Sequence, residues 1–299
     1  MKRIIFSVVS VILILIMCVG LAGPVFAAGS CPIAENLELT TYRNVSVGGN
    51  LSAYDPEDDV VSYQITTEPV KGSINLEQDG SFVYTPDENR KGKDYFGYKA
   101  LDTQGNLSQE ATVIIRIEKQ KTTMNYTDMA GRAGEYASVI LSEAGIFTGE
   151  KIGGAYCFSP EKEVSKGEFL CLCTLVSEKP VIKGVFSTGY TDDESIPFWM
   201  KEYVATAAMQ GMDKAGETAF NPDMPISKSE AAIMLDDALG LEDVDYLEPD
   251  FDPADSGIQA CINLNAAGIL ENTVNVSDNL TREEAAMLLV KAMQTIKNR

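Results

Sequence analysis

A ten-residue pattern occurs three times in the second half of this 299-residue chain. Each copy has an apolar residue, a Ser or Thr, a cation, one variable residue, a Glu and then an apolar run. The copies are VSKGEFLCLC from Val164, ISKSEAAIML from Ile226 and LTREEAAMLL from Leu280. Repetition of such units predicts a stacked or pseudo-symmetric array, in which each unit buries its apolar face against its neighbours.

The Ser or Thr and the Glu of each copy have the spacing of a helix capping box. The pairs are Ser165 and Glu168, Ser227 and Glu230, and Thr281 and Glu284. In a capping box the hydroxyl accepts the backbone N–H of the third helical residue, while the Glu side chain accepts the N–H of the cap residue. We therefore expect each copy to start a helix. Glu230 and Glu284 are also candidate ligand contacts.

Capping leaves the cation of each copy unexplained. A helix N-terminus already carries about half a positive charge, which disfavours Lys or Arg there, yet Lys166, Lys228 and Arg282 all fall in the first turn. Backbone N–H groups beside a cation form a carboxylate or phosphate site. We expect an anionic ligand at these helix starts, with the largest contribution from the two-pronged guanidinium of Arg282. The alternative is a solvated surface cation.

The segments between the motifs have helical periodicity. EYASVILSEAGIF, FWMKEYVATAAMQGM and SGIQACINLNAAGIL each reach a glycine that is a usual helix stop, namely Gly145, Gly211 or Gly268. Unit starts are marked by Tyr126-Thr127-Asp128, Tyr190-Thr191-Asp192 and Phe251-Asp252. The expected units, each a helix, a loop and a helix, are residues 126–183, 190–245 and 250–297.

Before residue 120 the periodicity is that of strands. Runs such as VVSYQITT, GSFVYTP and ATVIIRIE are rich in Val, Ile, Tyr and Phe and are separated by Gly, Asp, Asn and Pro, which is typical of a small antiparallel β-sandwich. We expect the sandwich over residues 32–119 and a polar linker over residues 120–125. The predicted fold class is multidomain: an all-β Ig-like sandwich followed by an all-α pseudo-threefold region.

Residues 1–28 predict a secretory signal peptide. Lys2 and Arg3 precede an unbroken apolar run from Ile4 to Val19, and small residues around Ala27 offer a cleavage site. The run is shorter than the ~20 apolar residues that a spanning helix needs, although an uncleaved anchor is the alternative. We expect the mature chain to be secreted, with no membrane segment of its own.

Charge and composition exclude several classes of function. A formal charge of −20 repels phosphate backbones, so nucleic acid is not an expected partner. The chain has no histidine, which removes Ser-His-Asp, Cys-His and His-ligated metal chemistry. No pair of carboxylates stands in a context that singles it out, and we expect no enzymatic activity. Cys171 and Cys173 are spaced CxC in an apolar run and are expected to be buried thiols.

Three segments of the sandwich region carry family features: DPEDD from Asp55, GSFVYTP from Gly80, and the stretch from Gly92 to Gly105. Together they resemble the bacterial cadherin-like (Ig-like) family. Members of that family often bind calcium, a hard cation that takes oxygen ligands. The resemblance implies a calcium site at Asp55, Glu57, Asp58 and Asp102. The alternative is that these acids only start turns, and apart from calcium we expect no cofactor.

The repeated helical units resemble the S-layer homology (SLH) family, whose members occur as three tandem units. Such triplets typically hold secretory proteins to the cell wall by binding secondary cell-wall polysaccharide that carries ketal-linked pyruvate. The family motif Thr-Arg-Ala-Glu is approached only by TREE from Thr281, and the family's aromatic partner by Trp199, with Ala133 and Ser256 at the corresponding positions. The polysaccharide contacts that the resemblance implies, in one or two competent grooves, are Arg282, Lys228, Lys166, Trp199, Glu284 and Glu230.

The expected function is therefore non-covalent anchoring of a secreted protein at the cell wall, with pyruvylated polysaccharide as the partner and the sandwich as a spacer or adhesion module. A first alternative is an adhesion or envelope-assembly protein, whose sandwich binds other surface proteins and whose triplet is degenerate and structural. A second alternative is a small wall hydrolase that works through two carboxylates. No catalytic-sized segment is left over for that activity.

Overall fold

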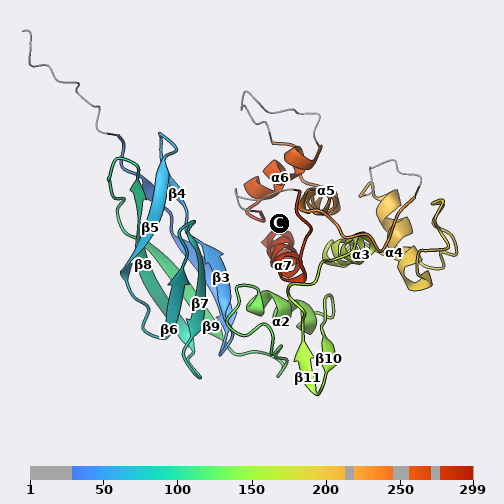
Figure 1. Ribbon diagram of the computed structural model, residues 1–299, viewed down its shortest axis with the longest axis horizontal. Helices are drawn as coiled ribbons and strands as arrows, with labels where there is room; N and C mark the ends of the chain where they lie inside the picture. Colours follow the sequence, from blue (N-terminus) through green and yellow to red (C-terminus); the bar gives the residue numbers. More distant parts are fainter. Residues whose placement is uncertain (1–28, 213–218, 245–255, 271–276, 299) are drawn as a thin grey trace, which may run out of the picture.

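The computed structural model describes residues 29–212, 219–244, 256–270 and 277–298. A β-sandwich forms the N-terminal part of the chain, and a region of mostly helices follows it (Figure 1). The expected signal peptide and the expected unit start at Phe251-Asp252 lie outside the described residues. Across the ranges just given, no helix combines the length and the apolar character that crossing a membrane requires.

The sandwich consists of a four-stranded sheet in the order β2-β9-β8-β5 and a three-stranded sheet in the order β3-β7-β6. The strands are β2 (Leu37–Tyr42), β3 (Val47–Asn50), β5 (Val60–Thr67), β6 (Gly72–Leu76), β7 (Ser81–Pro86), β8 (Gly92–Asp102) and β9 (Ala111–Glu118). A short antiparallel pair, β1 (Ile33–Ala34) and β4 (Ala53–Tyr54), accompanies them. The expectation of purely antiparallel pairing needs one correction, because β2 runs parallel to β9 at the sheet edge.

Alternation along each strand places one face of the sheets in the core. In β9, every second residue from Ala111 to Ile117 is buried. Phe82 and Phe96 meet edge to face between the sheets, with ring centroids 5.3 Å apart. The fully buried Tyr84 donates its hydroxyl to Asp94 at 2.8 Å, so a large ring is buried without an unpaired polar group. The expected β-sandwich is confirmed.

The helical region contains α2 (Glu135–Glu143), α3 (Lys166–Val176), α4 (Phe198–Met209), α5 (Lys228–Leu239), α6 (Ser256–Ala266) and α7 (Arg282–Asn298). It also contains an antiparallel hairpin of β10 (Glu150–Ile152) and β11 (Ala155–Cys157), so the expectation of an all-α region has to be corrected. Gly153 and Gly154 explain the hairpin. Their φ values of 58° and 94° are those of a tight turn whose twist matches the flanking strands.

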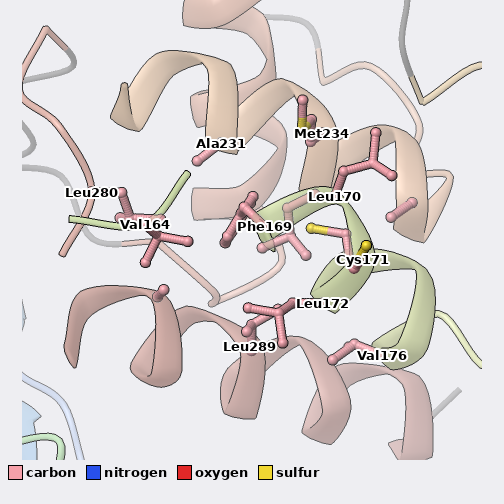
Figure 2. Close-up of a cluster of buried hydrophobic side chains, with 14 of the residues drawn as sticks. Val164, Phe169, Leu170, Cys171, Leu172, Val176, Ala231, Met234, Leu280 and Leu289 are labelled. Atoms are coloured by element: carbon pink, nitrogen blue, oxygen red, sulfur yellow. The ribbon is translucent and has the colours of Figure 1, made fainter. Parts of the chain in front are cut away.

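The residues that precede the three helix caps form a closed ring of backbone hydrogen bonds. Val164 donates its N–H to the carbonyl of Leu280 at 2.9 Å, Leu280 donates to Ile226 at 2.9 Å, and Ile226 donates to Val164 at 3.0 Å. All three side chains are buried in the core of the helical region. Figure 2 shows Val164 and Leu280 together with Phe169 of α3 and Ala231 of α5. The three repeated motifs thus meet in space.

The sandwich contacts the helical region directly at the start of α2. Gly48 of β3 donates its N–H to the carbonyl of Ala133 at 2.9 Å, and Tyr136 donates its N–H to the carbonyl of Ser46 at 3.1 Å. Figure 1 shows α2 beside this edge of the sandwich. The two regions are therefore joined by more than the segment 120–125.

Candidate functional site

Each repeated motif starts a helix at the expected residue. The hydroxyls of Ser165, Ser227 and Thr281 accept the backbone N–H of Glu168, Glu230 and Glu284 at 3.2, 3.2 and 3.3 Å. Glu230 and Glu284 complete the capping box by accepting the N–H of Ser227 at 3.0 Å and of Thr281 at 2.9 Å. The predicted box is confirmed in these two copies. In the first copy the carboxylate of Glu168 is instead bonded to the third unit.

That bond is made by Arg282, which is only 7% exposed. Its Nη1 lies 2.8 Å from Oε1 of Glu168, while Nε donates to the carbonyl of Phe158 at 2.8 Å and Nη2 to that of Thr148 at 3.0 Å. The guanidinium carbon lies 4.2 Å from the ring centroid of Phe147 and 4.9 Å from that of Phe158. Arg282 therefore has a structural role that the sequence analysis missed.

The other two cations also reach a neighbouring unit. Nζ of Lys228 lies 2.7 Å from Oε1 of Glu284, the capping Glu of the third unit. Nζ of Lys166 lies 5.2 Å from the ring centroid of Phe220 in the second unit. Each cation thus connects its own unit to the next around the ring. The threefold repetition of the motif could have indicated these contacts between units. Every copy has a cation and a Glu, and the cation of one copy can pair with the Glu of another once the copies meet.

The Asp residues at the unit starts, Asp128 and Asp192, also have a structural role that could not be seen in the sequence. The carboxylate of Asp128 accepts the backbone N–H groups of Phe158 and Ser159 at 2.8 and 2.7 Å. In the second unit, the carboxylate of Asp192 accepts those of Phe220 and Asn221 at 2.7 and 2.8 Å. Ser159 and Asn221 have φ values of 61° and 55°, so the carboxylate holds a left-handed loop residue in place. This positions Phe158 and Phe220 beneath the cations of the preceding units.

A cavity of about 250 Å³ opens beside the pair of Lys228 and Glu284. Its wall is mostly apolar and comes from α5, α6 and α7 and the residues next to them; it includes Leu264, Ile269, Leu280, Met287 and Leu288. The side chains of Lys228 and Glu284 are 20% and 40% exposed. Burial raises the pKa of Glu284, but hydrogen bonds from Lys228 and Thr281 outweigh it and hold the pKa below its usual value. At neutral pH an ion pair therefore faces an apolar wall.

Trp199 and Glu230 are not among the residues that line this cavity. Trp199 is the second residue of α4 and is 60% exposed. Its neighbour Phe198 is also exposed and lies against Phe186, with ring centroids 6.1 Å apart. Glu230 is exposed, and its carboxylate contacts its own cap residue. Of the six expected polysaccharide contacts, the structure brings together Lys228 and Glu284 at one cavity.

An acidic cluster lies between β4 and β5 of the sandwich. Asp55, Glu57 and Asp59 each place one carboxylate oxygen within 4.8 Å of the others. Asp55 is buried, and its burial raises its pKa. The negative charge of Asp59 raises the pKa of Asp55 further. In the described part of the chain, Oδ2 of Asp55 and Oδ1 of Asp59 are buried without a hydrogen-bond partner. Because such oxygens are unfavourable when unpaired, the cluster fits a hard cation.

Two of the four expected calcium ligands are placed differently. Asp58 is exposed and occupies a left-handed turn position with φ of 55°. Asp102 accepts the N–H of Gln104 at 2.9 Å and the N–H and side-chain amide of Asn106 at 2.7 Å each, so its carboxylate holds the turn after β8. Asp59 takes the place of Asp58 in the cluster. The DPEDD run contained this residue, but only the turn conformation decides which acid faces inward.

Residues 24–119 match the sequence model of the bacterial cadherin-like domain. The match agrees with the sandwich seen in the structure and supports the cadherin-like assignment of the N-terminal region, which is less than half of the chain. No curated protein matches the chain.

Several solved structures are similar to the chain over about a third of its length. They include the SrpA adhesin of Streptococcus sanguinis, with 16% identity, 33% of this chain and 63% of that structure covered, and a TM-score of 0.27. The sialic acid binding region of the Streptococcus sanguinis SK1 adhesin has 16% identity, coverages of 33% and 32%, and a TM-score of 0.25. The fibronectin(III)-like modules of Clostridium thermocellum CbhA have 16% identity, coverages of 32% and 51%, and a TM-score of 0.21. The chain thus spans less than two thirds of the length of each of these structures.

Proposed function

We propose that this chain is a non-enzymatic protein of the cell surface, whose helical region binds an anionic cell-wall polysaccharide and whose cadherin-like domain serves in adhesion to other surface proteins. The cavity at Lys228 and Glu284 is the observation that supports this most. A pyruvate ketal, the ligand implied by the SLH resemblance, places a carboxylate on a sugar. The sugar ring can pack on the apolar wall of the cavity while the carboxylate pairs with the ammonium group.

The contacts of the three cations favour Lys228 over Arg282 as the first ligand contact. Each guanidinium nitrogen of Arg282 already donates a hydrogen bond within the protein. An ammonium group has three donors, so Lys228 can keep its bond to Glu284 and still donate to a ligand carboxylate in the cavity. A direct role of Arg282 in binding stays a prediction.

The test measures binding to purified cell walls that carry the pyruvylated polymer. We expect Lys228→Ala to weaken binding about tenfold, the size of one charge-assisted hydrogen bond. Lys228→Arg should retain most of the affinity because it keeps the charge. Lys91→Ala, at an exposed lysine of the sandwich, is the matched control and should bind as the wild type does. The wild-type protein should not bind cell walls from which the pyruvylated polymer has been stripped. Unchanged binding by Lys228→Ala would remove the cavity as the site.

We also propose that Asp55, Glu57 and Asp59 bind calcium, because two of their buried oxygens lack a hydrogen-bond partner within the described residues. Calcium accepts carboxylate ligands in flexible geometry, which suits a cluster on a turn. The ion would stabilise the end of the sandwich at which β4, β5 and the turn after β8 meet, since Thr103 donates its N–H to the carbonyl of Asp59 at 3.1 Å.

A further inference from the structure

A second cavity, of about 310 Å³, lies between the sandwich and the helical region. Its walls come from β2 and β3 on one side and from the start of α2 and the part of α7 between Met287 and Lys297 on the other. Residues that line it include Thr40, Gly48, Tyr136, Lys291, Gln294 and Lys297. The cavity exists only because the two regions are packed together, so neither region could form it alone.

The two cavities adjoin each other along α7. Met287 and Lys291 line both of them. From Glu284 in the first cavity to Lys297 in the second, α7 advances by about 20 Å at 1.5 Å per residue. This length exceeds what a single sugar unit needs and suits a chain of several units.

The charges that line the second cavity favour an anionic occupant. Lys291, Gln294 and Lys297 are spaced three residues apart and so share one face of α7. This concentration of cationic and amide donors occurs in a chain with 24 basic and 44 acidic residues. The acid on the sandwich wall, Glu38, is paired with Arg116, which offsets its negative charge.

The position of the sandwich, and with it the shape of the cavity, is held by close contacts. Besides the backbone bonds from Gly48 to Ala133 and from Tyr136 to Ser46, the buried carboxylate of Glu135 accepts the N–H of Ser46 at 3.0 Å. A Cβ on Gly48 would lie 2.6 Å from Cβ of Ala133. Even an alanine at this position would therefore move the sandwich away from α2.

We propose that the interdomain cavity is a second subsite for the same anionic polysaccharide, so that an extended glycan lies along α7 from Lys228 across Lys291 to Lys297. The inference rests on the proposed function and adds to it that the cadherin-like domain forms part of the glycan-binding surface. It follows that affinity depends on the length of the glycan. A fragment that fills the first cavity alone gains nothing from the sandwich.

The test uses two purified fragments of the pyruvylated polymer, one repeating unit and several, in calorimetric titrations of the full mature chain. We expect Lys297→Gln to weaken binding of the long fragment about threefold to tenfold and to leave the short fragment unaffected. Gly48→Ala should have the same selective effect through displacement of the sandwich. Lys228→Ala should weaken both fragments, and the control Lys91→Gln neither. Unchanged melting temperatures for the lysine variants would show that the fold is intact.

The outcomes separate the two proposals. If the long fragment binds Lys297→Gln and Gly48→Ala as tightly as it binds the wild type, the second subsite is wrong, while a loss at Lys228→Ala still supports the first cavity. If Lys297→Gln weakens both fragments equally, its effect is general and the subsite is again rejected. If the wild type binds neither fragment, the proposed function fails and the extended site fails with it.

Discussion

Nη1 of Arg282 in the third unit lies 2.8 Å from Oε1 of Glu168 in the first, although 114 residues separate them. Lys228 and Glu284, at 2.7 Å, repeat this relationship between the second and third units. A cation is unfavourable beside the positive end of its own helix, but here the carboxylate at a neighbouring helix start offsets that cost. The repeated motif therefore encodes contacts between units as well as the start of each helix.

Arg282→Ala is expected to destabilise the fold. The change leaves Glu168 and the carbonyls of Phe158 and Thr148 without their donor, and should lower the free energy of unfolding by about 3 kcal/mol, the lower end for a buried pair because Glu168 is partly exposed. Thr281→Ala removes only a cap and should cost about 1 kcal/mol. Urea denaturation at 25 °C measures both. Equal stability of Arg282→Ala and the wild type would contradict the structural role.

Acid should remove the stabilisation that Glu284 provides. Its folded-state pKa is held below the ordinary value of 4.5, so its contribution is present above that value and is lost as the pH falls through the folded-state pKa. The melting temperature of the wild type should exceed that of Glu284→Gln at pH 7, and the difference should shrink as the pH falls below 4.5 toward the folded-state pKa. A constant difference between them from pH 7 to pH 3 would show that the charge of Glu284 is not responsible.

Millimolar calcium is expected to raise the melting temperature by mass action. Asp55→Asn and Asp59→Asn should abolish the rise, because their oxygens form the cluster with Glu57. Asp58→Asn is the matched control: it neutralises an adjacent acid whose left-handed conformation asparagine tolerates, and the rise should remain. Asp102→Asn should lower stability with and without calcium. Identical melting curves in calcium and in chelator would exclude the ion.

The two buried thiols of α3, Cys171 and Cys173, should be unreactive in the native state. Burial raises the pKa of Cys171 to about 12 and also raises that of Cys173, so at pH 8 only roughly one molecule in ten thousand has the reactive thiolate at Cys171. Iodoacetamide should label the exposed Cys31 first and reach Cys171 and Cys173 only in urea. Peptide mass spectrometry distinguishes the sites. Native labelling of Cys171 at the rate of Cys31 would show that α3 opens readily.

Gly48→Ala should loosen the junction between the two regions. The added Cβ overlaps Cβ of Ala133 at 2.6 Å and crowds its Cα at 3.0 Å, and overpacking of this kind typically costs about 1–3 kcal/mol. The double variant with Ala133→Gly removes the closer of the two contacts and should recover part of the loss. Thermal unfolding followed by circular dichroism checks both. If Gly48→Ala is as stable as the wild type, the contact between the sandwich and α2 can shift without loss of stability, and the prediction is wrong.

Local features of the fold could be predicted from the sequence. Capping involves residues three positions apart, so Ser227 with Glu230 and Thr281 with Glu284 were sufficient to locate two helix starts. Strand alternation needs only a period of two, which was sufficient for the sandwich. The burial of Cys171 and Cys173 followed from the apolar run around them. Each of these depends on neighbours in the chain, and neighbours in the chain are visible in the sequence.

Contacts between distant segments could not be predicted, because they exist only once the three motifs meet. From the sequence we expected Arg282 to be the strongest ligand contact. In the folded protein its side chain is enclosed by Phe147, Phe158 and Thr148. The same pairing at Lys228 borders an open cavity, because the side chains of α5, α6 and α7 leave space beside it. Thus the sequence by itself determined which residues start the helices and carry the charge. Only the tertiary structure decided which charge is enclosed and which one faces a cavity, because enclosure depends on side chains that other units contribute.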